Sequence, residues 1–150
     1  MGEIVPLLSA PIEGFESGDQ ALDRWLKLRA RSNEAAGFSR THVMVHNEKP
    51  IGFYSLSAAA FDLRASELGA KSAPEPIPAI LLGRMAVANT FQRLGVGKRL
   101  LADAIERAER FSRQVAATVL AVHPKPTARE YYLANGFAPI GNTEVVFLRL

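Results

Sequence analysis

The chain has 150 residues, of which 48% are hydrophobic and 22% charged, and this length and composition suit one globular domain with its own core. The absence of cysteine excludes disulfides, thiolate metal sites and a cysteine nucleophile, and because His42, His46 and His123 lack the spacing of a metal site we expect no metal. The net charge of +3 allows an anionic partner, and without a long apolar run or a secretory signal the protein is expected to be cytoplasmic, with no membrane segment.

The first third of the chain predicts a helix followed by a hairpin. Ser17–Gln20 has the pattern of a capping box, and apolar residues then recur at helical spacing, so a helix is expected from there to Gly37. Two segments of strand composition, Thr41–Val45 and Ile51–Ser57, flank turn-forming residues and therefore predict an antiparallel hairpin.

Residues 58–78 predict an irregular connection. A run of alanines is followed by Pro74, Pro76 and Pro78, and prolines so closely spaced argue against a continuous helix or a central strand. A short helix around Asp62–Gly69 is the one regular element expected there.

The second half of the chain alternates strands with helices. An apolar run at residues 79–87 predicts a strand buried on both faces, and apolar positions at helical spacing predict a helix over 97–111. Another buried strand is expected at 115–122, a short helix ended by Gly136 at 127–135, and a closing strand at 143–150. This order predicts a mixed α/β fold without internal repeats.

The segment between the first of these strands and the long helix reads Gln92-Arg-Leu-Gly-Val-Gly-Lys98. Its glycines, Gly95 and Gly97, let the backbone turn tightly and expose successive N–H groups at a helix start, an arrangement that binds phosphate. An ordinary tight turn with a basic rim would have the same letters. A Walker loop is excluded because Arg99 stands where a hydroxyl residue is needed, and Leu100 replaces the third glycine of a dinucleotide fingerprint.

In order and spacing these features resemble the GNAT superfamily of N-acetyltransferases, whose signature Gln/Arg-x-x-Gly-x-Gly/Ala matches residues 92–97. The hairpin before the motif, the helix after it and Tyr131–Phe137 also match. The resemblance implies a single GNAT domain over residues 1–150, of the α/β (α+β type) class. The implied fold is a mixed central sheet of six to seven strands with splayed fourth and fifth strands, flanked by about four helices. It further implies acetyl-CoA as co-substrate, bound by Met85, Ala86, Val87, Gln92, Arg93, Leu94, Gly95, Val96, Gly97 and Lys98.

The same resemblance implies a catalytic tyrosine. Tyr132 aligns with the tyrosine that family members place five residues before the Phe of the Gly-Phe pair, and it is the expected general acid for the departing CoA thiolate. Its neighbour Tyr131 would point about 100° away on a helix, into the core. A core aromatic is the alternative role for Tyr132, and no residue stands out as a general base.

A narrower resemblance covers nearly the full chain. Leu22–Leu26, Arg31–Asn33, Ser39–Thr41 and Leu82–Val87 look like segments of the acetyltransferase toxins of bacterial toxin–antitoxin operons. Those toxins acetylate the free α-amino group of aminoacyl-tRNA. The resemblance therefore implies aminoacyl-tRNA as substrate, a small DNA-binding antitoxin of the ribbon-helix-helix type as partner, and a homodimer.

Basic residues in and after the first helix support an RNA substrate. They form a plausible phosphate track, for which a solvated helix face is the alternative, and Trp25 between them is expected in the core. The residues expected to contact RNA are Arg24, Lys27, Arg31, Arg40 and Arg84.

Three functions thus remain open on the sequence. The favoured one is a toxin that acetylates aminoacyl-tRNA, followed by a GNAT enzyme for a small amine or a protein N-terminus. A CoA-binding regulator without transfer activity is the least favoured, because Tyr132 supplies an acid.

Overall fold

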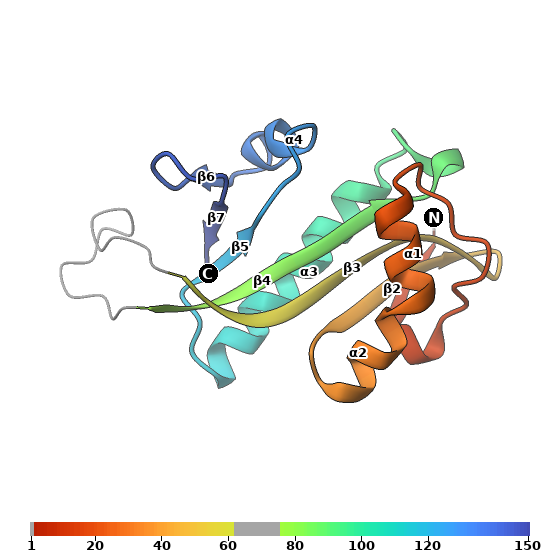
Figure 1. Cartoon of the computed structure of the whole chain (residues 1–150), viewed down its shortest axis with the longest axis horizontal. Coiled ribbons are helices and arrows are strands. Elements are labelled where there is room, and N and C mark those ends of the chain that lie inside the picture. The colour runs from red at the N-terminus through yellow and green to blue at the C-terminus, as the bar shows by residue number, and fades with distance from the viewer. Residues whose placement is uncertain (1, 62–75) are drawn as a thin grey trace. The chain divides into compact units, whose positions relative to one another are not determined.

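The computed structural model describes residues 2–61 and 76–150, and the short helix expected around Asp62–Gly69 lies outside them. In these residues, seven strands form one sheet in the order β1-β2-β3-β4-β5-β7-β6, and with four α-helices they confirm the expected GNAT fold class. The elements in chain order are β1 (Glu3–Pro6), the 3-10 helix η1 (Leu7–Ser9), α1 (Gln20–Leu28), α2 (Ala30–Ala36), β2 (Arg40–His46), β3 (Lys49–Phe61), β4 (Ile77–Val87), the 3-10 helix η3 (Asn89–Phe91), α3 (Val96–Gln114), β5 (Val119–Val122), α4 (Arg129–Ala134), β6 (Ala138–Pro139) and β7 (Val146–Arg149) (Figure 1).

The chain divides into two compact units. One comprises Met1–Ser57 and Gly83–Ala104, and the other comprises Ala58–Leu82 and Ile105–Leu150. Each unit has a cluster of buried hydrophobic side chains of its own. One domain over residues 1–150 remains a prediction.

The first helix begins at a different cap from the expected one, and it is interrupted. Asp19 is the N-cap, because its carboxylate accepts a hydrogen bond from the Leu22 N–H at 3.2 Å, whereas the Ser17 hydroxyl accepts one from the Asp19 N–H. Arg29, with φ −122°, separates α1 from α2. Gly37 ends α2 as expected, in the left-handed conformation with φ 77°.

The predicted hairpin is confirmed as β2 and β3. Asn47 and Glu48 both have positive φ, 50° and 61°, as the tight turn between two antiparallel strands requires, and His46 pairs with Lys49. β3 runs on to Phe61, so the alanine run belongs to a strand and not to a connection. Pairing within the sheet thus overrides the weak strand preference of alanine.

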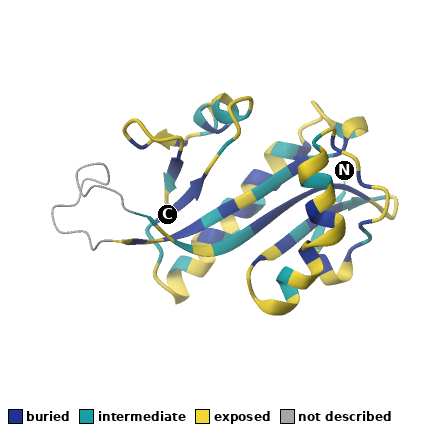
Figure 2. Ribbon diagram, in the orientation of Figure 1, coloured by how far each residue is buried: buried dark blue, intermediate teal, exposed yellow. Residues whose placement is uncertain are grey.

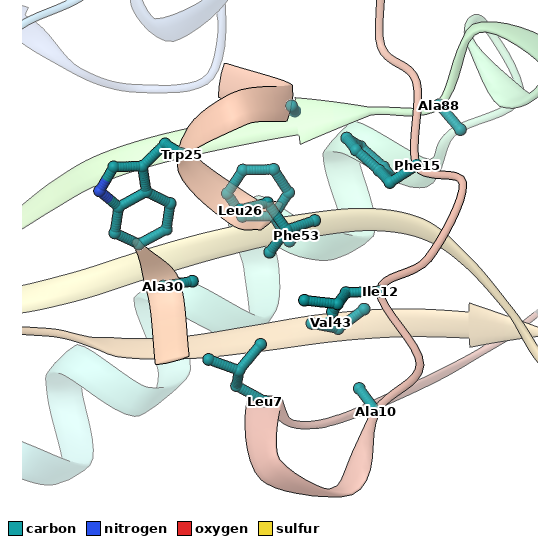
Figure 3. Close-up of a cluster of buried hydrophobic side chains, with 11 residues drawn as sticks. Leu7, Ala10, Ile12, Phe15, Trp25, Leu26, Ala30, Val43, Phe53 and Ala88 are labelled. Carbon is teal, nitrogen blue, oxygen red and sulfur yellow. The ribbon is translucent and has the colours of Figure 1, made fainter. Parts of the chain in front are cut away.

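The core of the first unit lies between the helices α1 and α2 and one face of the sheet. Phe53 is fully buried, its ring stacks on Trp25 with 6.1 Å between centroids, and it meets Phe15 edge-on at 5.4 Å, so the expected core position of Trp25 is confirmed (Figure 3). Figure 2 shows dark blue, buried positions along β2 and β3. The other buried members are Leu7, Ala10, Ile12, Leu26, Ala30, Val43, Ala86 and Ala88.

The second unit contains the first half of β4 with β5, β7 and β6. β4 and β5 are parallel and pair from Ala79 with Val119 to Leu81 with Ala121, while β5 and β7 are antiparallel. The β4–β5 pairing stops there although β4 continues, as expected for the splayed fourth and fifth strands. The buried residues here are Ile77, Ala79, Val119, Ala121, Ile140, Val145 and Phe147.

Several strand boundaries in the second half differ from those expected, and β7 begins at Val146, three residues later than predicted. β5 begins four residues later than expected because the helical pattern persists: the Val115 N–H still bonds to the Phe111 carbonyl at 2.9 Å. β4 begins earlier than expected and includes Pro78, which the strand tolerates near its start, where the Pro78 carbonyl accepts a hydrogen bond from Thr118 at 2.9 Å.

Candidate functional site

The predicted phosphate-binding loop lies between η3 and α3 in the first unit and contains two residues in the left-handed region. Arg93 has φ 64° and Gly95 has φ 86°. The first hydrogen bond of α3 runs from the Arg99 N–H to the Gly95 carbonyl at 3.2 Å, which makes Gly95 the N-cap. The N–H groups of residues 96–98 therefore have no partner within the helix, and with the positive end of the helix dipole they are suited to bind an anion.

The side chains at the rim of this loop have different roles. Arg93 and Lys98 are exposed and add two cations beside the N–H groups, and the apolar Leu94 between them is 59% exposed. The guanidinium of Arg99 instead donates to the Gly2 carbonyl at 3.2 Å and so fastens the N-terminal residues to α3.

The last residues of β4 present an edge to the same region. The Ala88 N–H bonds to the Ile51 carbonyl of β3 at 2.9 Å, and backbone groups alternate in direction along a strand. Ala86 therefore also points its N–H and carbonyl toward β3, whereas Met85 and Val87 point theirs away from it. Of the three predicted β4 residues, only Met85 and Val87 share the edge that a bound molecule could pair with.

Gly52 of β3 sets how closely α3 approaches the sheet. A Cβ at this position would lie 2.8 Å from Leu100 Cδ1, 3.2 Å from Val96 Cγ1 and 3.3 Å from the Ala86 carbonyl oxygen. Because residue 52 is glycine, the first turn of α3, which carries the anion site, can pack directly against the strands. Gly52 was not singled out from the sequence, although an isolated glycine within an apolar strand is the signal for such a close approach.

The side chain of Gln92, the first residue of the signature, forms hydrogen bonds with the protein backbone. Its amide Nε2 donates to the Ser17 carbonyl at 2.9 Å and to the Val87 carbonyl at 3.1 Å. The side chain of Gln92 is therefore a brace between the segment before α1 and the end of β4. Nothing in the sequence indicated this pairing.

Three of the predicted RNA-contacting residues come together at one cleft of about 540 Å³ between α1 and the loop before it. They are Arg24, Lys27 and Arg31. Glu13 lies 3.8 Å from Arg31 across the cleft, in an exposed ion pair. Arg24 and Lys27 have no ion-pair partner in residues 2–61 and 76–150, and the carboxylates of Glu13, Glu16 and Asp23 line the same cleft.

The other two predicted RNA-contacting residues have partners within the protein. Arg40 donates to the Glu34 carbonyl at 2.8 Å and lies 3.3 Å from its carboxylate. The guanidinium of Arg84 lies 4.2 Å from the ring centroid of Trp25, and burial lowers the pKa of Arg84. Contact of either residue with RNA stays a prediction.

Arg84 also marks an irregularity in β4. A Cβ on Gly83 would lie 3.3 Å from Ser55 Oγ, which is on the same face of the sheet as Phe53, and the Arg84 side chain reaches Trp25 on that face as well. Successive residues of a regular strand face opposite sides. Two neighbours on one face indicate a local irregularity in β4, shortly after its last pair with β5 at Leu81.

Tyr132 lies in α4 of the second unit and is only 6% exposed. Its ring packs edge-on against Phe137 at 5.5 Å and against Tyr131 at 5.6 Å. Burial, and to a smaller extent Tyr131, raises the pKa of Tyr132 far above its usual value, so the phenol keeps its proton. Tyr131 is half-buried and burial raises its pKa too. Tyr131, which was expected in the core, is thus partly buried, and Tyr132 is the more buried of the two.

The described residues contain neither a metal-binding cluster nor a membrane-spanning helix. Residues 2–61 and 76–150 hold no group of three His, Asp or Glu side chains arranged for a metal ion. None of the helices described is both long enough and apolar enough to cross a membrane.

Comparison with known proteins places these features in a family. Residues 37–139 match the family model described as an acetyltransferase (GNAT) domain. A tRNA-acetylating toxin from Mycobacterium tuberculosis is 33% identical over 141 residues, which cover 93% of this chain and 84% of the relative.

Solved structures of the same fold include two toxins. AtaT complexed with acetyl-methionyl-tRNAfMet has a TM-score of 0.88 at 24% identity, with 98% of this chain and 94% of that chain covered. A tyrosine-to-phenylalanine variant of KacT has a TM-score of 0.89 at 24% identity and the same coverage. The matched residues include the 92–98 loop, the β4 edge and Tyr132. The chain is thus an N-acetyltransferase and belongs to the GNAT family.

Proposed function

We propose that this acetyltransferase is a toxin that acetylates the α-amino group of aminoacyl-tRNA and so blocks translation. The observation that carries the proposal is the 33% identity, over 93% of the chain, to the tRNA-acetylating toxin of Mycobacterium tuberculosis. AtaT, whose structure contains acetyl-methionyl-tRNAfMet, has the same fold. A tRNA substrate implies action in the cytoplasm, where translation takes place.

Acetyl-CoA would bind to the first unit, along the β4 edge and over the 92–98 loop. Met85, through its N–H and carbonyl, and Val87, through its N–H, can pair with the amides of the pantetheine arm as a neighbouring strand would, whereas the Val87 carbonyl already accepts from Gln92. The N–H groups of residues 96–98 suit the pyrophosphate, with about 0.3–1 kcal/mol from the helix dipole and further attraction from Arg93 and Lys98. Structures of the AtaT toxin bound with acetyl-CoA and its antitoxin share the fold and support this assignment.

The transfer itself needs little from the protein besides position and one proton donor. A neutral amine attacks the thioester carbonyl carbon, so that a C–N bond forms and the C–S bond breaks. The nitrogen loses a proton to water, and the sulfur gains one. The α-amino group of an aminoacyl ester is a weaker base than an ordinary amine, so a substantial fraction of it is neutral near pH 7 and no basic side chain is required.

Tyr132 is the proposed proton donor to the departing sulfur. Its buried phenol stays protonated, which suits a donor and rules out action as a base at physiological pH. Tyrosine-to-phenylalanine variants of both AtaT and KacT share this fold, which supports a functional tyrosine. Water would restore the proton after each turnover.

The cleft beside α1 is the proposed RNA contact. Arg24 and Lys27, which have no ion-pair partner in the described residues, and Arg31 can each meet a phosphate. Arg40 and Arg84 would contribute less than expected, because each is engaged by a group of the protein. Binding through two or three phosphates should weaken steeply with salt, with each lost contact lowering the slope by about one.

The partners proposed are a small DNA-binding antitoxin and a second copy of this chain. AtaT is known bound to the C-terminus of its antitoxin AtaR, and KacTA is known in complex with DNA. Neutralisation by a ribbon-helix-helix antitoxin is expected by analogy with these systems. The homodimer stays a prediction from the family resemblance alone.

The deciding experiment measures labelled acetyl transfer from acetyl-CoA to a pool of charged tRNA. We expect label on aminoacyl-tRNA and none on deacylated tRNA, and we expect tRNA whose amino acid carries a blocked α-amine to remain unlabelled. Equal labelling of charged and deacylated tRNA would exclude the α-amine as acceptor.

A second candidate function is supported by one feature of the same cleft. Glu13, Glu16 and Asp23 line it together with the basic residues, and carboxylates favour a cationic acceptor such as a polyamine or a peptide N-terminus. Turnover with spermidine or short peptides, together with indifference to charged tRNA, would establish this function instead.

A further inference from the structure

Three contacts fasten the segment before α1 to the segment that leads into the 92–98 loop. The Asn89 N–H bonds to the Glu16 carbonyl at 2.8 Å, and the Gln92 amide bonds to the Ser17 carbonyl at 2.9 Å. Gly18 packs so closely on Asn89 that a Cβ there would lie 3.0 Å from the Asn89 Oδ1. Residues more than seventy positions apart in the sequence thus form one junction.

On its α1 side, the junction is continuous with the helix that carries the basic residues. Ser17 is buried, its N–H and its hydroxyl both bond to the Asp23 carboxylate, at 3.0 Å and 2.6 Å, and its hydroxyl accepts from the Asp19 N–H. Arg24, next to Asp23, lines a second cleft of about 540 Å³ together with Asn89. Ser17, whose carbonyl accepts the hydrogen bond from Gln92, is therefore fixed to the first turn of α1.

On its other side, the junction meets the anion site directly. Gln92 is followed by Arg93 in the left-handed conformation, then by Gly95 and the N–H groups of residues 96–98. A non-glycine residue with φ 64° is held there at a cost in backbone energy. The amide of Gln92 also holds the Val87 carbonyl at the end of the β4 edge.

We propose that Gln92 is a positioning residue through which occupation of the acetyl-donor site orders α1 and strengthens RNA binding. A donor molecule that fixes the 93–98 loop also fixes Gln92, which holds Ser17 and through it the start of α1. RNA then binds to a helix that is already ordered, so RNA binding no longer carries the entropic cost of ordering it. The inference rests on the proposed function for the identity of the acceptor, and by linkage RNA must strengthen donor binding by the same factor.

The test measures the dissociation constant of deacylated tRNA with and without saturating CoA, a pair that binds without turnover. For the unmodified protein we expect CoA to tighten tRNA binding about five-fold or more. In Gln92→Leu, which keeps the size of the side chain but removes both donated hydrogen bonds, that ratio should fall to one. The matched control is Gln114→Leu, the same change at an exposed residue at the end of α3, which should keep the full ratio.

Failure of this inference and failure of the proposed function give different results. No tRNA binding by the unmodified protein at any CoA concentration overturns both. Equal tRNA affinity with and without CoA overturns the coupling but not the proposed function. A Gln92→Leu protein that binds CoA more weakly but still shows the full CoA-dependent tightening of tRNA binding has the same meaning. If the leucine variant does not fold by circular dichroism, Gln92→Glu, which can only accept hydrogen bonds at this exposed position, must abolish the ratio.

Discussion

Replacing Gly52 by alanine should disturb the anion site, because the new methyl group would lie on the face of the sheet against which α3 packs. The new Cβ would lie 2.8 Å from Leu100 Cδ1, 3.2 Å from Val96 Cγ1 and 3.3 Å from the Ala86 carbonyl oxygen. Leu100 and Val96 are fully buried, and the carbonyl belongs to a paired strand, so none of the three atoms can give way without moving its element. The first turn of α3 must therefore shift outward.

The expected loss of folding stability follows from overpacking of a closed core. Inserting a methyl group into such a site destabilises by about 1–3 kcal/mol, and the lower chain entropy of alanine in the unfolded state returns about 0.4–1 kcal/mol. A net loss of about 1–2 kcal/mol should lower the unfolding midpoint by a few degrees for a chain of this size. Because the N–H groups of residues 96–98 move with α3, CoA affinity should fall about five-fold, which corresponds to about 1 kcal/mol.

Chemical denaturation and calorimetric titration with CoA measure the two effects. The matched control is Gly83→Ala, where the nearest atom is a single rotatable hydroxyl, Ser55 Oγ at 3.3 Å, and where little or no loss of stability is expected. Adding Leu100→Val to Gly52→Ala should recover stability beyond the sum of the single changes, since it removes the closest clashing methyl. A Gly52→Ala protein with unchanged stability and unchanged CoA affinity would refute the reasoning.

Three further changes are expected to act by separate mechanisms. Gly95→Ala has open space around its new Cβ but φ 86°, so it should cost about 1–2 kcal/mol through the backbone and weaken CoA binding, by calorimetry. Tyr132→Phe should lower kcat about 10²–10⁴-fold with the fold intact, and near-normal turnover would remove the acid role. Because burial raises the Tyr132 pKa, its contribution to stability should be present below about pH 10 and decline above it, and the phenylalanine variant should show less alkaline destabilisation in denaturant titrations. Arg84→Lys should lose the planar contact with Trp25, at 4.2 Å, and destabilise by about 0.5–2 kcal/mol, with a change in indole fluorescence that Arg110→Lys should not produce.

Local patterns in the sequence were enough to predict the elements that carry the site. The apolar run before the glycines, the helical spacing after them and the turn residues of the hairpin are short-range signals, and β4, α3 and the β2–β3 pair lie where those signals indicated. The motif at 92–97 likewise predicted a tight turn with N–H groups exposed at a helix start, and the structure forms it with Gly95 in the left-handed region. These features need only a few neighbouring residues, so a single sequence determines them.

Other features depend on residues far apart in the chain, and only the tertiary structure decided them. Gln92 looked like a residue that contacts the ligand, but its partner Ser17 lies 75 positions away, and no local pattern could reveal that brace. Arg84 looked like one of several equal cations until the fold brought its guanidinium over the ring of Trp25, 59 positions earlier in the chain. The sequence thus determined the acetyl-donor loop, because local residues set its backbone conformation. Which polar residues hold the fold together and which face a substrate was decided by long-range packing.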